Sequence, residues 1–333
     1  MRTGMILFLL GMLLGCEKGL VKNKNFGEAL GTTYSITYLS EKKMDIQREI
    51  DSVFQNINQS LSTYISDSDI SRINNGDTTV VVDQSFRDVY FNSQVVNYET
   101  DGYFDPTVGV LVDAWGFGPG KQINALDSTQ VDSLMQYVGW IKVGLNKDFT
   151  ITKTKPEIRF DFNAIAKGYT IDRLGRMLDK KGVHQYLVEL GGEVLAKGTN
   201  RISERPWTVG VDDPNNPEAR GSAAILRLED RALASSGNYR KFRIDSDTGE
   251  KFVHTINPKT GYTKNSNVLS ATVITKYCIE ADAYATAFMA MDLQQSKELL
   301  ERRSDLEAFI IYVDEQGEVQ RFITDGFQEL LLN

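Results

Sequence analysis

The residues best suited to take part in chemistry lie toward the C-terminus, where Asp282 and Thr286 stand four positions apart in an expected helix. Residues four apart share one helix face, so the carboxylate and the hydroxyl point the same way. Such oxygen donors suit Mg2+ or Ca2+ far better than Zn2+. An ordinary helix cap or an exposed polar pair would look the same, so the pair predicts a cation site only when other segments complete it.

A second segment has the character of an anion site. Asp161 closes an expected strand, and the small residues that follow lead into an expected helix ending near Gly182. Free N–H groups at a helix start attract phosphate, and Lys167 adds a positive charge there. The segment is neither a Walker loop nor a G-x-G-x-x-G fingerprint. A plain strand-to-helix turn with a solvated lysine explains it equally well.

Glycine-flanked stretches supply two further features. In Ala114-Trp115-Gly116, an indole between small residues offers a flat surface on which an aromatic ring system can stack. The alternative is a buried core tryptophan. The segments Leu190-Gly191-Gly192-Glu193 and residues 235–239 read as strand ends with tight turns, and either could be purely structural.

Together these segments resemble the ApbE family of flavin transferases, the FAD:protein FMN transferases. The resemblance runs from about Leu30 to about Asp292. Its motifs, in order, are residues 30–34, 61–64 with 68–74, 102–118, 161–172, 189–193, 236–239, 254–261 and 282–286. The chain departs from the usual pattern at four positions. Leu30 stands where the family more often has Met, Asn238 and Asn257 where it more often has Asp, and Thr263 where it more often has Pro.

The resemblance implies Mg2+-dependent transfer of the FMN moiety of FAD to a Thr or Ser hydroxyl of an acceptor protein, an electron-transport subunit, with release of AMP. Asp282, Thr286 and the Ala164 carbonyl would hold the Mg2+. Asp282 and His254 would be catalytic, with His254 as the base because imidazole titrates near neutral pH. The residues expected to contact FAD are Leu30, Tyr64, Ala114, Trp115, Gly116, Asp161, Lys167, Ile256 and Ala285.

Three other functions stay open at this point, one of them that of an unrelated periplasmic binding lipoprotein, which would not require this ordered set of motifs. The same residues would serve an FAD pyrophosphatase that gives FMN and AMP, with water replacing the acceptor hydroxyl. A lipid-anchored flavin-binding protein without chemistry is the second, although simple binding needs no set of metal ligands and base. A structural role for His254 is also open, in which it pins the turn at residues 257–261.

The N-terminus predicts a targeting segment. Arg2 precedes an apolar run at residues 5–14, and Leu13-Leu14-Gly15-Cys16 resembles a bacterial lipobox. The expected organisation is a signal peptide at residues 1–15, a lipidated Cys16 with a polar tether at 16–27, and an ApbE-like domain at 28–333. Two or more acyl chains anchor a protein stably, which implies a membrane lipoprotein facing the extracytoplasmic side. A secreted or cytosolic protein with an unmodified Cys16 is the alternative.

Composition fits a soluble enzyme body. The chain has 333 residues, is 41% hydrophobic and carries a net charge of −8, which argues against a nucleic-acid partner. Because the chain has only two Cys and two His, we expect no His/Cys zinc site. Cys278 is expected to be a small buried apolar residue, and His184 a structural residue outside the motifs.

Hydrophobic periodicity predicts an α+β fold with mixed or antiparallel sheets and packed helices in one compact catalytic unit. Besides the helix that ends near Gly182, helices are expected at residues 46–61, 131–138, 279–291 and 294–303. Strands are expected at residues 33–39, 186–190, 207–211, 223–228, 268–275, 308–313 and 319–323, the last two joined by a turn at 314–317.

Overall fold

The centre of the molecule is an eight-stranded sheet in which every neighbouring pair is antiparallel. The computed structural model describes residues 19–119, 126–212, 222–238, 242–244, 251–263 and 267–332. Across the sheet the strands run β1 (Val21–Ala29), β2 (Thr32–Ser40), β5 (Tyr186–Leu190), β6 (Glu193–Lys197), β9 (Arg231–Gly237), β12 (Val268–Thr275), β13 (Glu307–Val313) and β14 (Val319–Ile323). The predicted α+β class with antiparallel sheets is confirmed.

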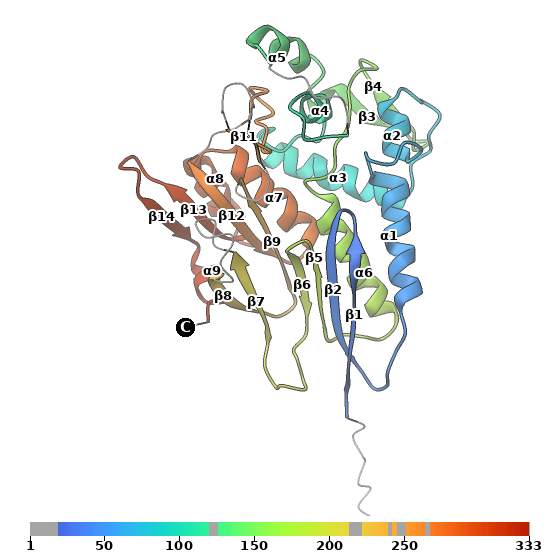
Figure 1. Cartoon of the computed structure of the whole chain (residues 1–333), viewed down its shortest axis with the longest axis vertical. Coiled ribbons are helices and arrows are strands. Elements are labelled where there is room, and N and C mark those ends of the chain that lie inside the picture. The colour runs from blue at the N-terminus through green and yellow to red at the C-terminus, as the bar shows by residue number, and fades with distance from the viewer. Residues whose placement is uncertain are drawn as a thin grey trace, which may run out of the picture.

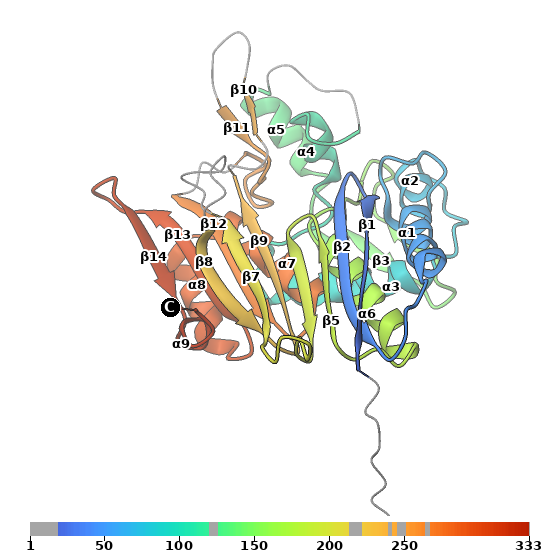
Figure 2. The same ribbon diagram turned by 60° about the horizontal axis from the view of Figure 1, so that its bottom comes forward.

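Helices cover one face of this sheet (Figures 1 and 2). They are α1 (Gln47–Leu61), α3 (Gln84–Glu99), α6 (Ala166–Lys180), α7 (Cys278–Ala290) and α8 (Leu293–Arg302). Eleven of the thirteen residues of α7 are buried, because the helix lies between β9 and β12 on one side and α3 and α6 on the other. A helix apolar on all sides is typical of such a central position.

The opposite face is covered by the pair β7 (Trp207–Asp212) and β8 (Ser222–Leu228), with α9 (Asp325–Gln328) beside it. Figure 2 shows β7 and β8 in front of the sheet and the helices behind it. Trp207, Leu226, Phe309 and Phe327 belong to the apolar cluster on this side. The sheet therefore has a buried core on each face.

A smaller lobe stands above one end of the sheet (Figure 2). It contains α4 (Gly109–Ala114), α5 (Ser128–Met135), β10 (Phe242–Ile244) and β11 (Lys251–Val253). A third apolar cluster joins α4 and α5 to Ile256. The remaining elements lie near α1 and α3: α2 (Asp69–Asn74), a 3-10 turn (Trp140–Lys142), β3 (Val143–Leu145) and β4 (Ile151–Lys153). The expected helix at 131–138 begins and ends three residues earlier than predicted.

The predicted tether at 16–27 is wrong at its C-terminal end, because residues 21–27 belong to β1. Of the nine residues of β1, all described, only Asn23 is buried, so this edge strand lacks the apolar alternation that identifies strands. The expected signal peptide and Cys16 lie outside the described residues. In the described part of the chain, no helix is both long and apolar enough to cross a bilayer.

Candidate active site

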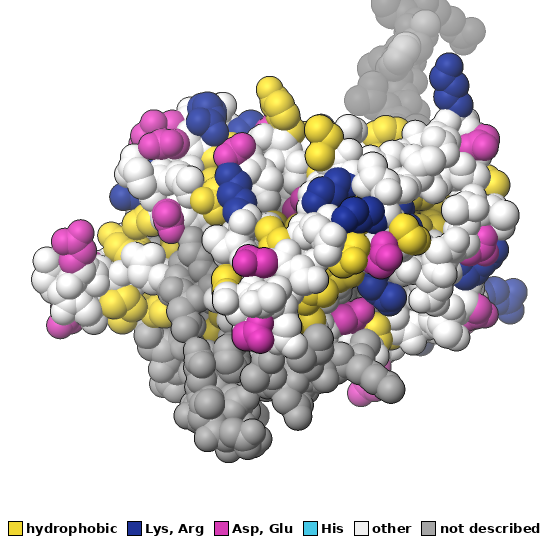
Figure 3. All heavy atoms as spheres, turned by 90° about the horizontal axis from the view of Figure 1, so that it is seen from above, with side chains coloured by type: hydrophobic (Ala, Val, Ile, Leu, Met, Phe, Trp, Pro, Cys, Tyr) yellow, Lys and Arg dark blue, Asp and Glu magenta, His cyan; other side chains and the backbone are white. Residues whose placement is uncertain are grey.

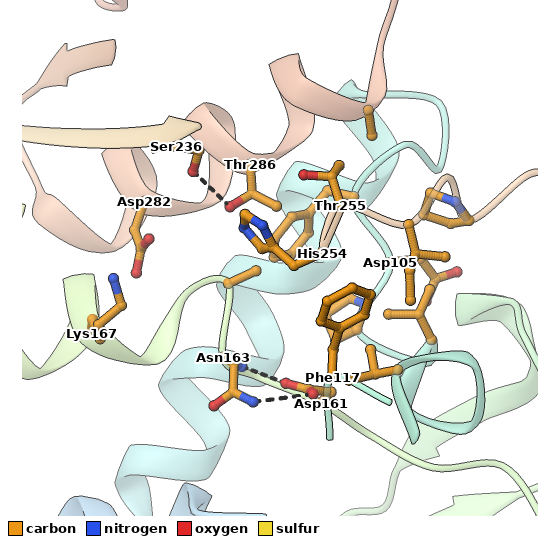
Figure 4. Close-up of a pocket in the computed structure, with 18 of the residues that line it drawn as sticks. Asp105, Phe117, Asp161, Asn163, Lys167, Ser236, His254, Thr255, Asp282 and Thr286 are labelled. Atoms are coloured by element: carbon orange, nitrogen blue, oxygen red, sulfur yellow. Dashed lines mark hydrogen bonds between the residues drawn. The ribbon is translucent and has the colours of Figure 1, made fainter. Parts of the chain in front are cut away.

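A cavity of about 480 Å³ lies where the small lobe meets the end of the sheet, and its size is typical of a site for a small molecule. Its wall combines strand ends and turns with the turn before α6 and the inner face of α7. It is completed by residues 103–106, Val108, Val112, Phe117, residues 254–256 and Pro258. Figure 4 shows how these segments, far apart in sequence, converge.

The crossing of α6 and α7 places Asp282 in this wall. At Gly168 the two helices come so close that an added Cβ would lie 2.2 Å from the Cys278 carbonyl oxygen and 2.8 Å from Asp282 Cβ. The Gly168 N–H donates to Asp282 Oδ2 at 2.9 Å. The first turn of α6 therefore both allows the close approach and orients the buried carboxylate.

Asp172, also on α6, holds the start of α7. Its two carboxylate oxygens accept from the N–H groups of Cys278 (2.9 Å) and Ile279 (3.0 Å). Burial raises the pKa of Asp172 to about 6, so the group is still charged at neutral pH. Because these are first-turn N–H groups of a helix, Asp172 acts as a cap supplied from another helix.

Asp172→Ala is expected to lower the free energy of unfolding by about 2–4 kcal/mol, because two buried donors lose their acceptors. Urea denaturation followed by circular dichroism measures the loss. Asp172→Asn keeps one acceptor oxygen and should cost clearly less. Equal, small losses for both variants would show that the cap is dispensable.

Two buried carboxylates and one lysine form the charged end of the cavity. Asp282 and Glu193 are 3% and 2% exposed, and the Lys167 ammonium donates to Glu193 Oε1. Burial raises the pKa of both carboxyls, that of Glu193 to about 7, while the Lys167 charge opposes the shift. Figure 4 shows the Lys167 and Asp282 side chains pointing toward one another.

The hydroxyl and imidazole groups lie beside this charged end. Thr286, one turn after Asp282, shares a hydrogen bond of 3.2 Å with the Ser236 hydroxyl of β9 (Figure 4). His254 follows β11 and lines the cavity, and its neighbour Thr255 donates to Asn238 Oδ1 at 2.8 Å. The expected alignment of Asp282 and Thr286 on one helix face is confirmed.

The other end of the cavity is built around Asp161 and aromatic side chains. Asp161 accepts from the backbone and side-chain nitrogens of Asn163 at 2.7 and 3.1 Å. Phe117 and Tyr103 line this region. Tyr64 lies on an exposed turn after α1, and the Asp161 charge contributes, after burial, to raising the pKa of its hydroxyl.

Comparisons with known proteins identify the family of this chain. A model of the ApbE family matches residues 30–310. The FAD:protein FMN transferase of Haemophilus influenzae is 31% identical over 321 residues, covering 93% of this chain and 92% of its own. The chain belongs to the ApbE family. The FAD:protein FMN transferase of Vibrio cholerae is 32% identical, covering 96% of this chain and 93% of its own. The solved flavin transferase ApbE from Vibrio cholerae superposes with a TM-score of 0.81 at 29% identity, covering 94% and 100% of the two chains.

This ApbE-family chain brings seven of the predicted site residues together. The cavity is lined by Asp161, Ala164, Lys167, His254, Ile256, Asp282 and Thr286. They come from segments separated by up to 125 positions, so only the fold assembles them. Leu30, Tyr64, Ala114, Trp115, Gly116 and Ala285 lie outside the wall that the described residues form.

The Trp115 ring faces the core and not the described cavity, so its predicted contact with FAD stays a prediction. The indole is 4% exposed, packs in the third apolar cluster and donates its Nε1–H to the Gly261 carbonyl at 2.9 Å. It thus ties α4 to the loop that carries His254. Ala285 also lies outside the described wall, with its side chain buried within α7, and its predicted contact is likewise untested.

Sequence reasoning left several cavity-lining residues without a role, among them Glu193 and Ser236. Glu193 is the first residue of β6, directly after two glycines, and Ser236 lies at the end of β9, directly before Gly237. The available signal was an acidic residue directly after two glycines, since such a residue leaves a tight turn at the same edge as the other motifs. The buried Cys278 is as predicted, and His184 is exposed beside Asp179, away from the cavity.

Proposed function

We propose that this chain transfers the FMN moiety of FAD to a Thr or Ser hydroxyl of an acceptor protein and releases AMP. The observation that carries the proposal is the meeting of Asp282, Thr286, Lys167 and His254 in one cavity. The similarity to proteins named FAD:protein FMN transferase supplies the substrate. Phe117 and the Asp161 end offer apolar and polar surface for the rings and hydroxyls of the dinucleotide.

In the proposed reaction the acceptor hydroxyl oxygen bonds to the FMN phosphorus, and the bond from that phosphorus to the bridging oxygen breaks. AMP leaves with the bridging oxygen. His254 accepts the hydroxyl proton as this bond forms, because a neutral imidazole is a base near neutral pH. Lys167 lies where its ammonium offsets negative charge on the pyrophosphate.

The residues present fit a Mg2+ ion. Among the described residues no cluster of three His, Cys, Asp or Glu side chains exists, so an all-carboxylate cage is excluded there. Asp282, Thr286 and the Ala164 carbonyl form an oxygen-only set, which suits an ion that keeps several waters and also binds substrate phosphate. When bound, the ion would neutralise charge on the phosphates during displacement.

The test is incubation of the purified protein with FAD, Mg2+ and an acceptor protein, followed by in-gel flavin fluorescence and measurement of AMP. A covalent fluorescent label with equimolar AMP is the expected result. AMP without label would identify an FAD pyrophosphatase, and neither product would identify a flavin-binding protein. Omitting the acceptor should suppress most of the AMP released by a transferase.

We also propose that the chain is a lipoprotein anchored through Cys16 on the extracytoplasmic side of a bacterial membrane. The lipobox-like Leu13-Leu14-Gly15-Cys16 supports it. Cys16→Ser is expected to remain unprocessed and to lack lipid, which mass spectrometry and fractionation into membrane and soluble material would show. A processed, membrane-bound Cys16→Ser protein would contradict the anchor.

Because β1 is part of the sheet, the boundary for a soluble enzyme is earlier than the predicted residue 28. A chain starting at Gly19 keeps β1 and is expected to retain full activity without lipid. A chain starting at Glu28 loses most of the β1–β2 ladder and should melt at a lower temperature. Equal melting temperatures for the two would show that β1 contributes little.

A further inference from the structure

Glu193 is a buried acid whose second oxygen is unsatisfied. Its Oε1 accepts from Lys167, whereas no donor among the described residues reaches its Oε2, although that atom is buried. Oε2 faces the Gly191 turn, where an added Cβ would lie 3.4 Å from it. A buried polar group without a partner destabilises the folded state, so its presence at a cavity wall calls for a functional explanation.

The charges around the cavity supply that explanation. Its described wall contains four carboxylates and one ammonium: Asp105, Asp161, Glu193 and Asp282, with Lys167. Glu193 already pairs with Lys167, so the ammonium that would attract a pyrophosphate is neutralised in the free protein. At this end Glu193, Asp282 and Lys167 sum to a net −1 when ionised, which repels an anionic ligand.

We propose that Glu193 makes nucleotide binding conditional on a divalent cation. The inference rests on the proposed function, because it takes FAD and Mg2+ as the ligands of this cavity. A divalent cation changes the local net charge from −1 to +1, which turns repulsion of the pyrophosphate into attraction. Without the Glu193 charge the same end is neutral, so the nucleotide binds without waiting for the cation.

Equilibrium binding of FAD tests this without any turnover. Flavin fluorescence is titrated at pH 8, above the Glu193 pKa of about 7, once in EDTA and once in saturating Mg2+. The wild type, Glu193→Gln and Glu189→Gln are compared. Glu189 is the matched control: it lies on the adjacent strand β5, contacts the Gly192 N–H at 3.0 Å and is outside the cavity wall.

In EDTA, Glu193→Gln is expected to bind FAD tighter than the wild type by on the order of tenfold, the effect of removing one nearby charge at an intermediate dielectric. In Mg2+ the variant keeps the same advantage of one charge, +2 against +1, so what distinguishes it is measurable FAD binding in EDTA, where the wild type binds weakly. Glu189→Gln should behave as the wild type.

A purely structural Glu193 would lower FAD affinity in both media, and this result, or an FAD affinity in EDTA equal to that of the wild type, overturns the proposal. If Glu193→Gln does not fold, Glu193→Met removes the same charge with a flexible apolar side chain and must show the same gain in EDTA. A wild type that binds FAD equally well in EDTA and Mg2+ overturns the cation part of the proposed function itself. A wild type that binds no FAD overturns that function entirely, so the failures are distinguishable.

Discussion

Asp282→Ala is expected to abolish flavin transfer and to weaken FAD binding in Mg2+. The variant removes the one charged ligand in the proposed oxygen set, and it also leaves the Gly168 N–H without its acceptor. We expect the transfer rate to fall by at least about 10³, as when a main electrostatic contributor to a transition state is removed. In-gel flavin fluorescence with a time course gives the rate.

Asp282→Asn separates the two consequences, because it keeps an acceptor for Gly168 but loses the charge. It should fold as well as the wild type and remain nearly inactive. Thr286→Ala should be impaired less than either, since a neutral hydroxyl contributes less to a cation than a carboxylate does. Full Mg2+-dependent activity in Asp282→Ala would show that the cation is held elsewhere.

His254→Ala should slow transfer by roughly 10²–10⁴, the usual contribution of a positioned general base. FAD affinity should stay within a few-fold of the wild type, because a neutral imidazole beside the phosphate adds little to ground-state binding. The rate profile should also lose its limb near the imidazole pKa. Single-turnover rates across pH, together with FAD titrations, measure all three.

A purely structural role for His254 leads to different expected results. The turn at 257–261 already closes through Gly261 N–H to the Asn257 carbonyl (2.8 Å) and Lys259 N–H to Asn257 Oδ1 (2.9 Å). Were His254 needed only for that turn, the substitution would lower the melting temperature and FAD affinity together, and the residual rate would keep its pH dependence. A His254→Ala variant that binds FAD normally and transfers flavin at a near wild-type rate would exclude both roles.

Much of the fold was predictable because many of its helices and strands are encoded by the spacing of neighbouring residues. The spacing of Asp282 and Thr286 needed only helix geometry, and β5, β12 and β14 have the bounds that apolar alternation predicted. The edge strand β1 was missed because it buries one asparagine and little else. Its pairing with β2, which no periodicity encodes, is what makes it a strand.

The site was predictable as a set of motifs but not as a set of contacts. The sequence placed Lys167 near phosphate, yet its ion pair joins residues 26 positions apart and depends on the β5–β6 turn. Trp115 looks the same in sequence whether its ring faces a ligand or a core. Its hydrogen bond to Gly261, 146 positions away, shows that the ring faces the core.

Figure 3 shows acidic and basic side chains interspersed on the face seen from above, and composition alone does not specify this distribution of charges.

The place of β1 has a mechanical consequence. Ladder hydrogen bonds run perpendicular to the strands, and β1 pairs with β2 from Val21↔Ser40 to Ala29↔Thr32. A pull on Val21 along the strand therefore loads the whole ladder in shear instead of opening it one bond at a time. Thr32, at the far end of that ladder, lines the cavity. A force on the N-terminus, of the kind that the proposed anchor at Cys16 would transmit, therefore meets the whole β1–β2 ladder at once.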